Sequence, residues 1–482
     1  MVKFSRTVWF LLFAWTALTA QEPVKWKDID SGMRFPGIWV QEWLDEGHFV
    51  YRQERSLLVQ NARNGETRPL IDPGRMEALG QLGVPPDAFA SGNSDYSQLI
   101  YIHENDLYHF DCVKKELKRL TETKGEEQNP TLSPDAGCVA YTRDGNLYLQ
   151  NLNEPGKEIA LTSDGSETVL NGYASWVYYE EILGRRGNYQ AFWFSPDSRK
   201  LVFLRFDQSQ VRQYPVLWFN ELYGKLELQR YPKPGTPNPE VTLQLADIRS
   251  GTVEPVKIPE TEGNYLAFPR FSEYDGHNLY VQWLNRDQDH FRIYEIDMKN
   301  GKSCVAYEET QPAWIDFLEE SDLIFLPGRK MILRSSRDGW FHLYRIDGKG
   351  GVHQLTRGEW SVNSIAAANV KTGTVYFTAY KEDSTRQDLY RMELKNSRIT
   401  RLTDGKSHHM CNVSPNGRYY IDTASTLIRP AVTTLVNTVG GQKKLLSDST
   451  KDLLKKYQIS EPKLIRVKTP DGLELPVVYV LP

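Results

Sequence analysis

Two adjacent glutamates, Glu180 and Glu181, are the residues of this chain whose type and spacing best fit a binding function. The aromatic residues Trp176, Tyr178 and Tyr179 come just before them. A protonated α-amino group, with a usual pKa of ~7.7 to 8.0, presents several N–H donors and suits paired carboxylates in a partly desolvated pocket. The pattern therefore predicts a site for a substrate ammonium group, bound by the two glutamates and supported by the three aromatic side chains.

A second interpretation of the same residues stays open. The chain has other glutamate pairs that are expected on solvated surface, namely Glu126-Glu127, Glu308-Glu309 and Glu319-Glu320. Neighbouring positions of an α-helix do not face the same way, so adjacent glutamates converge on one ligand only at a helix end or a special bend. The aromatic residues equally fit core packing. The element that carries the pair must decide between these interpretations.

A weak repeat of strands and turns predicts the elements that position the glutamates. Leu-Thr pairs close successive units at Leu120-Thr121, Leu161-Thr162, Leu355-Thr356 and Leu402-Thr403. The first two pairs are 41 residues apart and the last two are 47 apart, which is the period of a four-stranded propeller blade. Turns of the Ser-Pro-Asp kind support the repeat, because proline fixes φ and the next polar residue completes a type I turn. They occur at Ser133-Pro134-Asp135, Ser195-Pro196-Asp197 and Ser414-Pro415-Asn416.

These marks predict an all-β fold, an eight-bladed β-propeller. We expect its blades near residues 43–71, 96–123, 130–163, 164–258, 266–308, 313–356, 362–403 and 408–446. The fourth segment is about twice the usual length, and the glutamates lie in its extra part between Asp164 and Gln190. An insertion into one repeat marks a loop on one face, commonly the binding face.

The ends of the chain differ from the repeat. Residues 1–20 hold two basic residues, a short apolar run and then small residues, which is typical of a signal peptide and predicts a secreted or periplasmic protein. Residues 21–42 form an N-terminal segment and residues 43–446 the propeller. Residues 447–482 are predicted to be a linker and two strands joined by a turn. A lone hairpin is marginal in water, so we expect these strands to begin a further domain.

Composition excludes several classes of partner. The net charge of -4 and the pI near 6.2 give no basic surface for nucleic acid. The four cysteines are widely separated and do not have the paired spacing of a metal site. Their sequence is compatible with one or two disulfides and equally with small buried thiols. His408-His409-Met410-Cys411 carries soft metal ligands without a partner set, and we interpret it as a blade loop. No metal and no cofactor is expected.

The glutamate motif also carries a family resemblance. Trp176-Val177-Tyr178-Tyr179-Glu180-Glu181, followed by Phe192-Trp193-Phe194-Ser195-Pro196-Asp197, resembles the dipeptidyl peptidase IV family of the prolyl oligopeptidase clan, and the similarity continues through residues 213–215, 231–239 and 281–286. In that family the two glutamates clamp the free N-terminus of a peptide, and Glu180 and Glu181 are the matching positions. The resemblance implies a substrate-gating propeller of a secreted serine exopeptidase that releases di- or tripeptides after Pro or Ala, and a homodimer.

Two features depart from the family pattern. The family's early-blade arginine, which holds a substrate carbonyl, has no counterpart in residues 101–108, and this leaves dipeptide or tripeptide release open. No G-x-S-x-G nucleophile motif occurs in the 482 residues, so the resemblance implies that the catalytic Ser, Asp and His lie in a hydrolase domain after Pro482. Residues 475–482 resemble the first strands of that α/β-hydrolase domain, truncated as it begins. We therefore expect no peptide hydrolysis by these 482 residues alone. The alternative to the exopeptidase function is a non-catalytic periplasmic propeller that binds peptides or acts as a scaffold.

Overall fold

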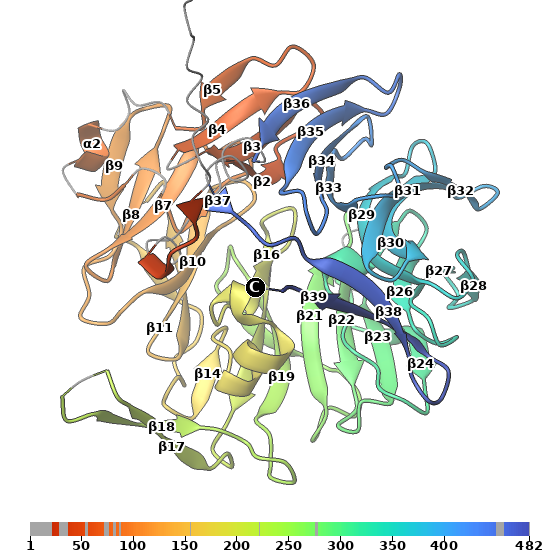
Figure 1. Ribbon diagram of the computed structural model, residues 1–482. Helices are drawn as coiled ribbons and strands as arrows, with labels where there is room; N and C mark the ends of the chain where they lie inside the picture. The colour runs from red at the N-terminus through yellow and green to blue at the C-terminus, as the bar shows by residue number, and fades with distance from the viewer. Residues whose placement is uncertain are drawn as a thin grey trace, which may run out of the picture.

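The chain folds into a ring of antiparallel sheets. The computed structural model describes residues 22–27, 37–53, 56–71, 77–80, 83–85, 88–154, 156–220, 222–274, 278–449 and 457–481. Within these residues, eight sheets of four or five strands follow one another along the chain. Figure 1 shows them arranged around a centre, with fourth strands such as β5, β9 and β32 at the rim. The predicted eight-bladed β-propeller is therefore confirmed.

The first four blades occupy the N-terminal half of the described chain. Blade 1 consists of β2 (Ile38–Trp43), β3 (His48–Gln53), β4 (Ser56–Asn61) and β5 (Thr67–Pro69). Blade 2 consists of β6 (Ser91–Gly92), β7 (Gln98–His103), β8 (Asp106–Asp111) and β9 (Glu116–Arg119). Blade 3 consists of β10 (Gln128–Leu132), β11 (Cys138–Arg143), β12 (Asn146–Asn151) and β13 (Glu158–Ala160). Blade 4 consists of β14 (Val169–Asn171), β15 (Phe192–Phe194), β16 (Lys200–Asp207), β19 (Glu240–Asp247) and β20 (Val253–Val256).

The other four blades are regular. Blade 5 consists of β21 (Tyr265–Phe271), β22 (Leu279–Leu284), β23 (His290–Ile296) and β24 (Ser303–Thr310). Blade 6 consists of β25 (Leu323–Leu326), β26 (Lys330–Ser335), β27 (His342–Ile346) and β28 (Val352–Gln354). Blade 7 consists of β29 (Ser361–Asn369), β30 (Thr374–Asp383), β31 (Arg386–Glu393) and β32 (Arg398–Arg401). Blade 8 consists of β33 (His408–Val413), β34 (Tyr419–Ser425), β35 (Val432–Asn437) and β36 (Lys443–Asp448).

In the part of the chain that the structure describes, three strand pairs lie outside the blades. The hairpin of β17 (Gln213–Trp218) and β18 (Lys225–Arg230) projects from blade 4 (Figure 1). β1 (Glu22–Pro23) pairs in parallel with β37 (Tyr457–Gln458), and β38 (Lys463–Lys468) forms a hairpin with β39 (Glu474–Tyr479). The helices are α2 (Glu77–Gly80), η2 (Tyr178–Ile182), η3 (Arg185–Gly187) and η4 (Glu320–Asp322).

The Leu-Thr pairs perform the same task in four blades. Each threonine Oγ1 accepts the backbone N–H of a leucine in the third strand, at 2.8 Å from Leu107 N, 3.0 Å from Leu147 N, 2.9 Å from Leu343 N and 3.0 Å from Leu389 N. The same hydroxyl also forms a hydrogen bond with the side chain of the residue immediately before that leucine. This residue is Asp106, Asn146, His342 or Asp388. The pair recurs because each blade must satisfy the same buried N–H.

The Ser-Pro-Asp motifs form the predicted turns between the first and second strands of a blade. In blade 3 the Ser133 carbonyl accepts the N–H of Ala136 at 2.8 Å, and the Ser133 hydroxyl donates to Asp135 at 2.7 Å. Blades 4 and 8 repeat both bonds at Ser195 and Ser414. The motif thus fixes the ends of the first strands, including β15 next to the glutamates.

Hydrophobic cores lie between neighbouring blades, since each sheet buries both faces. Blade 4 packs on blade 5 through side chains that include Tyr178, Phe206, Val281 and Trp283. Blades 1 and 8 close the ring through Phe49, Tyr51, Tyr419 and Ile421, and Trp43 Nε1 donates to the Asn412 carbonyl at 3.3 Å. No strand of the described chain is exchanged between blades 1 and 8, so side chains make this closure.

The predicted signal peptide, residues 1–20, lies outside the described residues. Within the part of the chain that is described, the helices are too short or too polar to cross a bilayer. The segment interpreted from sequence as a loop, residues 408–411, is instead part of strand β33, because it pairs with β34 along its whole length.

Candidate functional site

The glutamates lie on an insertion that interrupts the first strand of blade 4. β14 and β15 both pair with β16, at Val169 to Asp207 and at Phe192 to Phe203, so residues 172–191 leave the sheet and return to it. Gly172 begins the insertion with φ +68°, and a Cβ there would approach Leu147 and Phe192 to 3.2 Å. Glycine meets both requirements, since it adopts positive φ without cost and adds no side chain.

A π-helix, η2, carries Glu180 and Glu181. Its defining bond runs from the Leu183 N–H to the Tyr178 carbonyl at 2.7 Å, five residues apart. Single π turns are rare and occur frequently at functional sites. The glutamates therefore lie on a special bend, and the surroundings of each side chain decide whether the two converge on one ligand.

Tyr178 anchors this helix in the core. Its side chain is fully buried, packs edge-on against Phe206 with ring centroids 4.8 Å apart, and accepts the Leu266 N–H at 3.3 Å. Burial raises the pKa of the Tyr178 hydroxyl far above its usual value, so the hydroxyl stays neutral. Tyr178 thus joins the glutamate helix to blade 5.

The other two predicted aromatic residues lie on different sides of the helix. Tyr179 stacks on Tyr189 at 3.8 Å, and Tyr189 stacks on Tyr173 at 4.8 Å, so three rings brace the insertion. Trp176 packs on Tyr231 at 4.6 Å and lines a separate cavity of about 420 Å³ beneath the β17–β18 hairpin. Both residues support the insertion, and neither lines the cavity that Glu181 faces.

Glu180 is held by an arginine of the same insertion. Arg185, in the 3-10 turn η3, donates from Nε to Glu180 Oε2 at 2.7 Å, and its Nη2 contacts the other carboxylate oxygen. The Glu180 side chain is only 15% exposed, whereas that of Arg185 is 71% exposed. A bidentate arginine fixes both the position and the charge of the carboxylate.

Glu181 lines a large cavity between blades 4, 5 and 6. The cavity has a volume of about 800 Å³. Its wall includes Glu181, Ile182, Tyr265, Phe268, Gln288, Trp314, Asp316, Phe317, Glu319, Asp322 and Arg334. The wall also includes Ser321, Asn363 and Ser364, so polar side chains outnumber the aromatic ones. A cavity of several hundred Å³ has the size of a site for a small ligand.

The charges around this cavity are mostly negative. Arg334 donates to Asp322 at 2.5 Å and so is neutralised. Among the described residues, no cation lies within ion-pair distance of Glu181, Asp316 or Glu319. The cavity therefore favours a cationic group, and Glu181 offers a carboxylate for it.

The structure brings together some functional residues that the sequence did not indicate. Arg185 follows a glycine, and its sequence context predicts an exposed loop residue. Its position five residues after Glu180 was the only feature of the sequence that could have indicated an ion pair between the two. Trp314 and Phe317 come from the connection between β24 and η4, more than a hundred residues from the glutamates. Only the ring of blades brings such segments to one cavity.

Comparison with protein families gives one match. Residues 103–431 match the family described as the dipeptidyl peptidase IV (DPP IV) N-terminal region. This range contains the insertion with both glutamates and seven of the eight blades in whole or in part.

Curated relatives and solved structures agree with this match. A probable dipeptidyl peptidase 4 of Aspergillus fumigatus is 30% identical over 413 residues, which are 79% of this chain and 52% of that protein. A dipeptidyl peptidase 4 of Trichophyton rubrum is 27% identical over 467 residues, 92% of this chain and 59% of that protein. The crystal structure of Porphyromonas gingivalis dipeptidyl peptidase 4 superposes with a TM-score of 0.83 at 26% identity, covering 96% of this chain and 68% of that one. This chain thus spans about half the length of the curated relatives it matches.

Proposed function

The chain belongs to the dipeptidyl peptidase IV N-terminal region family, and from this premise we propose that it selects peptides by their free N-terminus for a serine exopeptidase. The single observation that carries the proposal is the placement of Glu181 on an acidic, aromatic-walled cavity of about 800 Å³, with Glu180 fixed beside it on the same π-helix. The reaction served would be release of an N-terminal di- or tripeptide after Pro or Ala.

The chemistry of an N-terminus suits this cavity. A peptide α-amino group carries a positive charge at neutral pH and needs an acceptor when it leaves water. Glu181 supplies a carboxylate at the cavity wall, which also includes the aromatic side chains of Phe268 and Phe317. An acetylated N-terminus has neither the charge nor the three donors, so it should be rejected.

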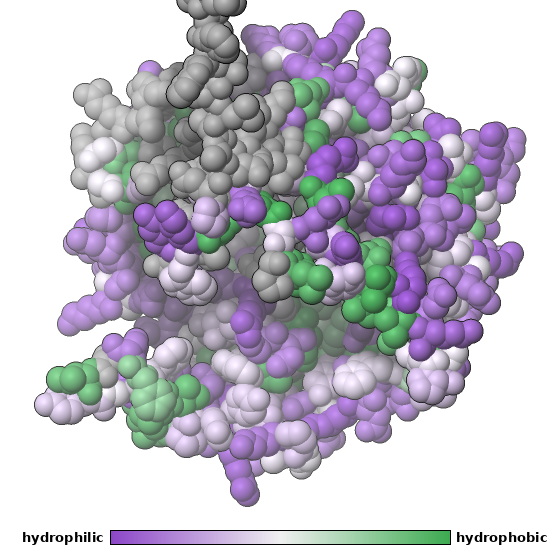
Figure 2. Space-filling view, in the orientation of Figure 1, coloured by the Kyte–Doolittle hydropathy of each residue, from purple (hydrophilic) through white to green (hydrophobic). Residues whose placement is uncertain are grey.

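Catalysis is proposed to come from a hydrolase domain outside these residues. The β38–β39 hairpin supports this proposal, because it is fixed to blade 7 by Arg466, which donates to Asp383 at 2.9 Å, yet exposes apolar side chains. Those side chains include Val467, Leu475 and Val478, between 43% and 51% exposed, and Figure 2 shows the apolar area over β38 and β39. We interpret these strands as the beginning of that domain.

The number of residues released is proposed to depend on the group that binds the substrate carbonyl. In blade 2, the β7–β8 hairpin, which lacks the family's arginine as the sequence indicated, presents His103 and Tyr108, whose rings are 6.0 Å apart. Neither side chain carries a permanent charge to bind a substrate carbonyl. Both dipeptide and tripeptide products fit the proposal.

A second copy of the chain is the proposed partner of the β17–β18 hairpin. Its tip exposes Phe219 to 83%, Leu222 to 92% and Tyr223 to 96%. Figure 2 shows this apolar group projecting from the molecule, where water contact is costly. The proposed homodimer would cover the tip of this hairpin.

The proposed location of the protein is secreted or periplasmic.

Hydrolysis of Gly-Pro-anilide tests the proposal. The assay compares these residues alone with a protein that also contains the coding sequence downstream of Pro482. We expect no turnover by the first and turnover by the second. A downstream sequence without a nucleophile serine, or a longer protein that binds peptides without cleaving them, would favour the non-catalytic scaffold.

A further inference from the structure

His409 lies buried at the junction of blades 7 and 8, away from the cavity of Glu181. It is the second residue of β33, and its side chain is only 2% exposed. Its backbone carbonyl accepts the side-chain amide of Gln387, in β31 of blade 7, at 2.8 Å. Neither the proposed substrate site nor the proposed hydrolase contact uses this residue.

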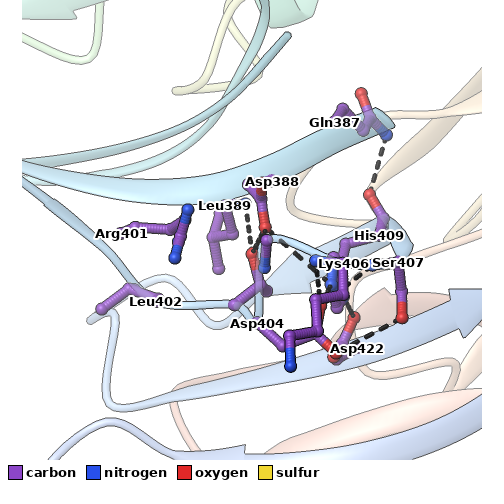
Figure 3. Close-up of polar contacts among 12 residues, drawn as sticks. Gln387, Asp388, Leu389, Arg401, Leu402, Asp404, Lys406, Ser407, His409 and Asp422 are labelled. Carbon is purple, nitrogen blue, oxygen red and sulfur yellow. Dashed lines mark hydrogen bonds and ion pairs between the residues drawn. The ribbon is translucent and has the colours of Figure 1, made fainter. Parts of the chain in front are cut away.

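Both ring nitrogens of His409 face carboxylates, as Figure 3 shows. Nδ1 lies 2.8 Å from Oδ1 of Asp422, which belongs to β34 of the same blade. Nε2 lies 2.9 Å from Oδ1 of Asp404, which follows β32 of blade 7. An ionised carboxylate only accepts hydrogen bonds, whereas a neutral imidazole donates from one nitrogen. Two such bonds therefore require the doubly protonated imidazolium.

Other groups around His409 leave this arrangement intact. Asp388 of β31 has Oδ1 3.9 Å from Nε2, and this oxygen already accepts from Thr403 and the Gly405 N–H. On β33 itself, His408 has its pKa lowered by burial and by His409, and Cys411 has its pKa raised by burial. Arg429 reaches the same loop by donating to Ser407 Oγ at 3.1 Å, and the Lys406 N–H donates to Asp404.

A metal ion is the competing interpretation of this cluster. In the described residues, Asp388, Asp404 and His409 place ligand atoms within 4.8 Å of one another. However, Asp388 bonds to Thr403 as Asp106 bonds to Thr121, and in blade 3 the uncharged Asn146 takes the same role. The position requires an acceptor rather than a charge, so the blade repeat already explains Asp388.

We propose that His409 is a protonation-dependent pin, which as an imidazolium ties Asp404 of blade 7 to Asp422 of blade 8 and which releases one of them when it loses a proton. The junction of these blades is then most stable below the usual pKa of a histidine and becomes less stable as the pH rises through the raised pKa of His409. This inference is independent of the proposed peptide selection.

The direction of the pH effect follows from the charges. Burial acts to lower the pKa of His409, but its bonds to Asp422 and Asp404 outweigh burial and raise the pKa above its usual value of 6.5. Stability from a raised pKa is fully present below the unfolded pKa and is lost as the pH rises through the folded one. Burial acts to raise the pKa of Asp404, but hydrogen bonds from the Lys406 N–H and from His409 outweigh burial and lower this pKa. Asp404 therefore stays charged into acidic solution.

Thermal unfolding from about pH 5.5 to about pH 9 tests the pin in the chain itself. Three variants are compared with wild type: His409→Gln, Asp404→Asn and the control His353→Gln, an exposed histidine of β28. The stability advantage of wild type over His409→Gln should shrink as the pH rises. Each unit by which the folded pKa exceeds ~6.5 corresponds to about tenfold in the folding equilibrium. His353→Gln should change little at any pH.

Two results would overturn the pin. One is a wild-type advantage that is independent of pH, since a neutral, merely structural histidine gives that profile. The other is stabilisation by added Zn²⁺ that His409→Gln abolishes. If His409→Gln does not fold, Asp404→Asn still decides, because removing this charge should move the loss of stability to lower pH. Nitrogen chemical shifts of the His409 ring give a direct second readout, since we expect both nitrogens to stay protonated to a higher pH than in an exposed histidine.

Discussion

Arg185 binds the Glu180 carboxylate at the end of the π-helix, with 2.7 Å between Nε and Oε2, while Glu181 one residue later faces the cavity. The two adjacent glutamates therefore have different surroundings. Glu180 is already neutralised within the protein, and Glu181 is the carboxylate that a substrate ammonium can reach.

This difference predicts unequal effects of two matched substitutions. Glu181→Gln should weaken binding of a peptide with a free N-terminus by about tenfold or more, because it removes a charge-assisted hydrogen bond. Glu180→Gln should weaken it less, because Arg185 competes for that carboxylate. Calorimetric titration of both variants measures this, and a larger loss for Glu180→Gln would show that the substrate displaces Arg185.

Removal of the arginine charge should act in the opposite direction. Arg185→Gln frees the Glu180 carboxylate, so peptide affinity should rise a few-fold at low salt and return to the wild-type value at high salt. Stability should change by less than ~1 kcal/mol, because the arginine is mostly exposed. Unchanged affinity at low salt would mean that Glu180 lies out of reach of the peptide.

Tyr178 should matter for stability more than for binding chemistry. Tyr178→Ala should lower the free energy of unfolding by about 3–5 kcal/mol, as expected for a buried aromatic residue. Tyr178→Phe should cost about 1–2 kcal/mol, since the Leu266 N–H loses its acceptor. Urea denaturation of both variants checks the prediction, and wild-type stability of Tyr178→Phe would exclude a role for the hydroxyl.

The Leu-Thr motif can be tested at Thr356, which is 1% exposed. Thr356→Val keeps the shape but leaves the Leu343 N–H and His342 without their hydroxyl partner, so it should cost about 1–3 kcal/mol. Thr356→Ser keeps the hydroxyl and should cost clearly less. Thermal unfolding distinguishes the two, and equal stability of both variants would contradict the assigned role.

The β17–β18 hairpin provides a test of self-association. Phe219→Ser combined with Leu222→Ser should lower the dimer fraction in sedimentation velocity, because these apolar side chains are 83% and 92% exposed at the tip of the hairpin. Val113→Ser, an exposed apolar residue of blade 2, is the control and should leave the distribution unchanged. A wild-type chain that is monomeric throughout would remove this role from the hairpin.

The fold could be predicted because short motifs repeat a local task. Leu-Thr pairs and Ser-Pro-Asp turns each satisfy the same backbone groups in successive blades, so their spacing gives the period. The split of the first strand of blade 4 into β14 and β15 was not visible, since it depends on pairing with β16 across the insertion. Strand β33 was taken for a loop because two histidines mask its alternation.

The site could be predicted only in part. The aromatic and acidic pattern indicated the insertion, but Tyr178 lies in the core and Trp176 lines a different cavity. Sequence spacing does not show which side of a π-helix a residue occupies. Arg185 and the walls from Trp314 to Phe317 depend on tertiary placement, and their contribution to the cavity follows from the ring of blades.

Calorimetric titration of this chain with a Gly-Pro peptide, free or acetylated at its N-terminus, tests N-terminal selection most directly. We predict that the acetylated peptide binds at least about tenfold more weakly, that Glu181→Gln removes the difference, and that the control Glu254→Gln, at the exposed rim of the same blade, preserves it. Equal affinity of wild type for the two peptides, or a difference that persists in Glu181→Gln, would contradict the account.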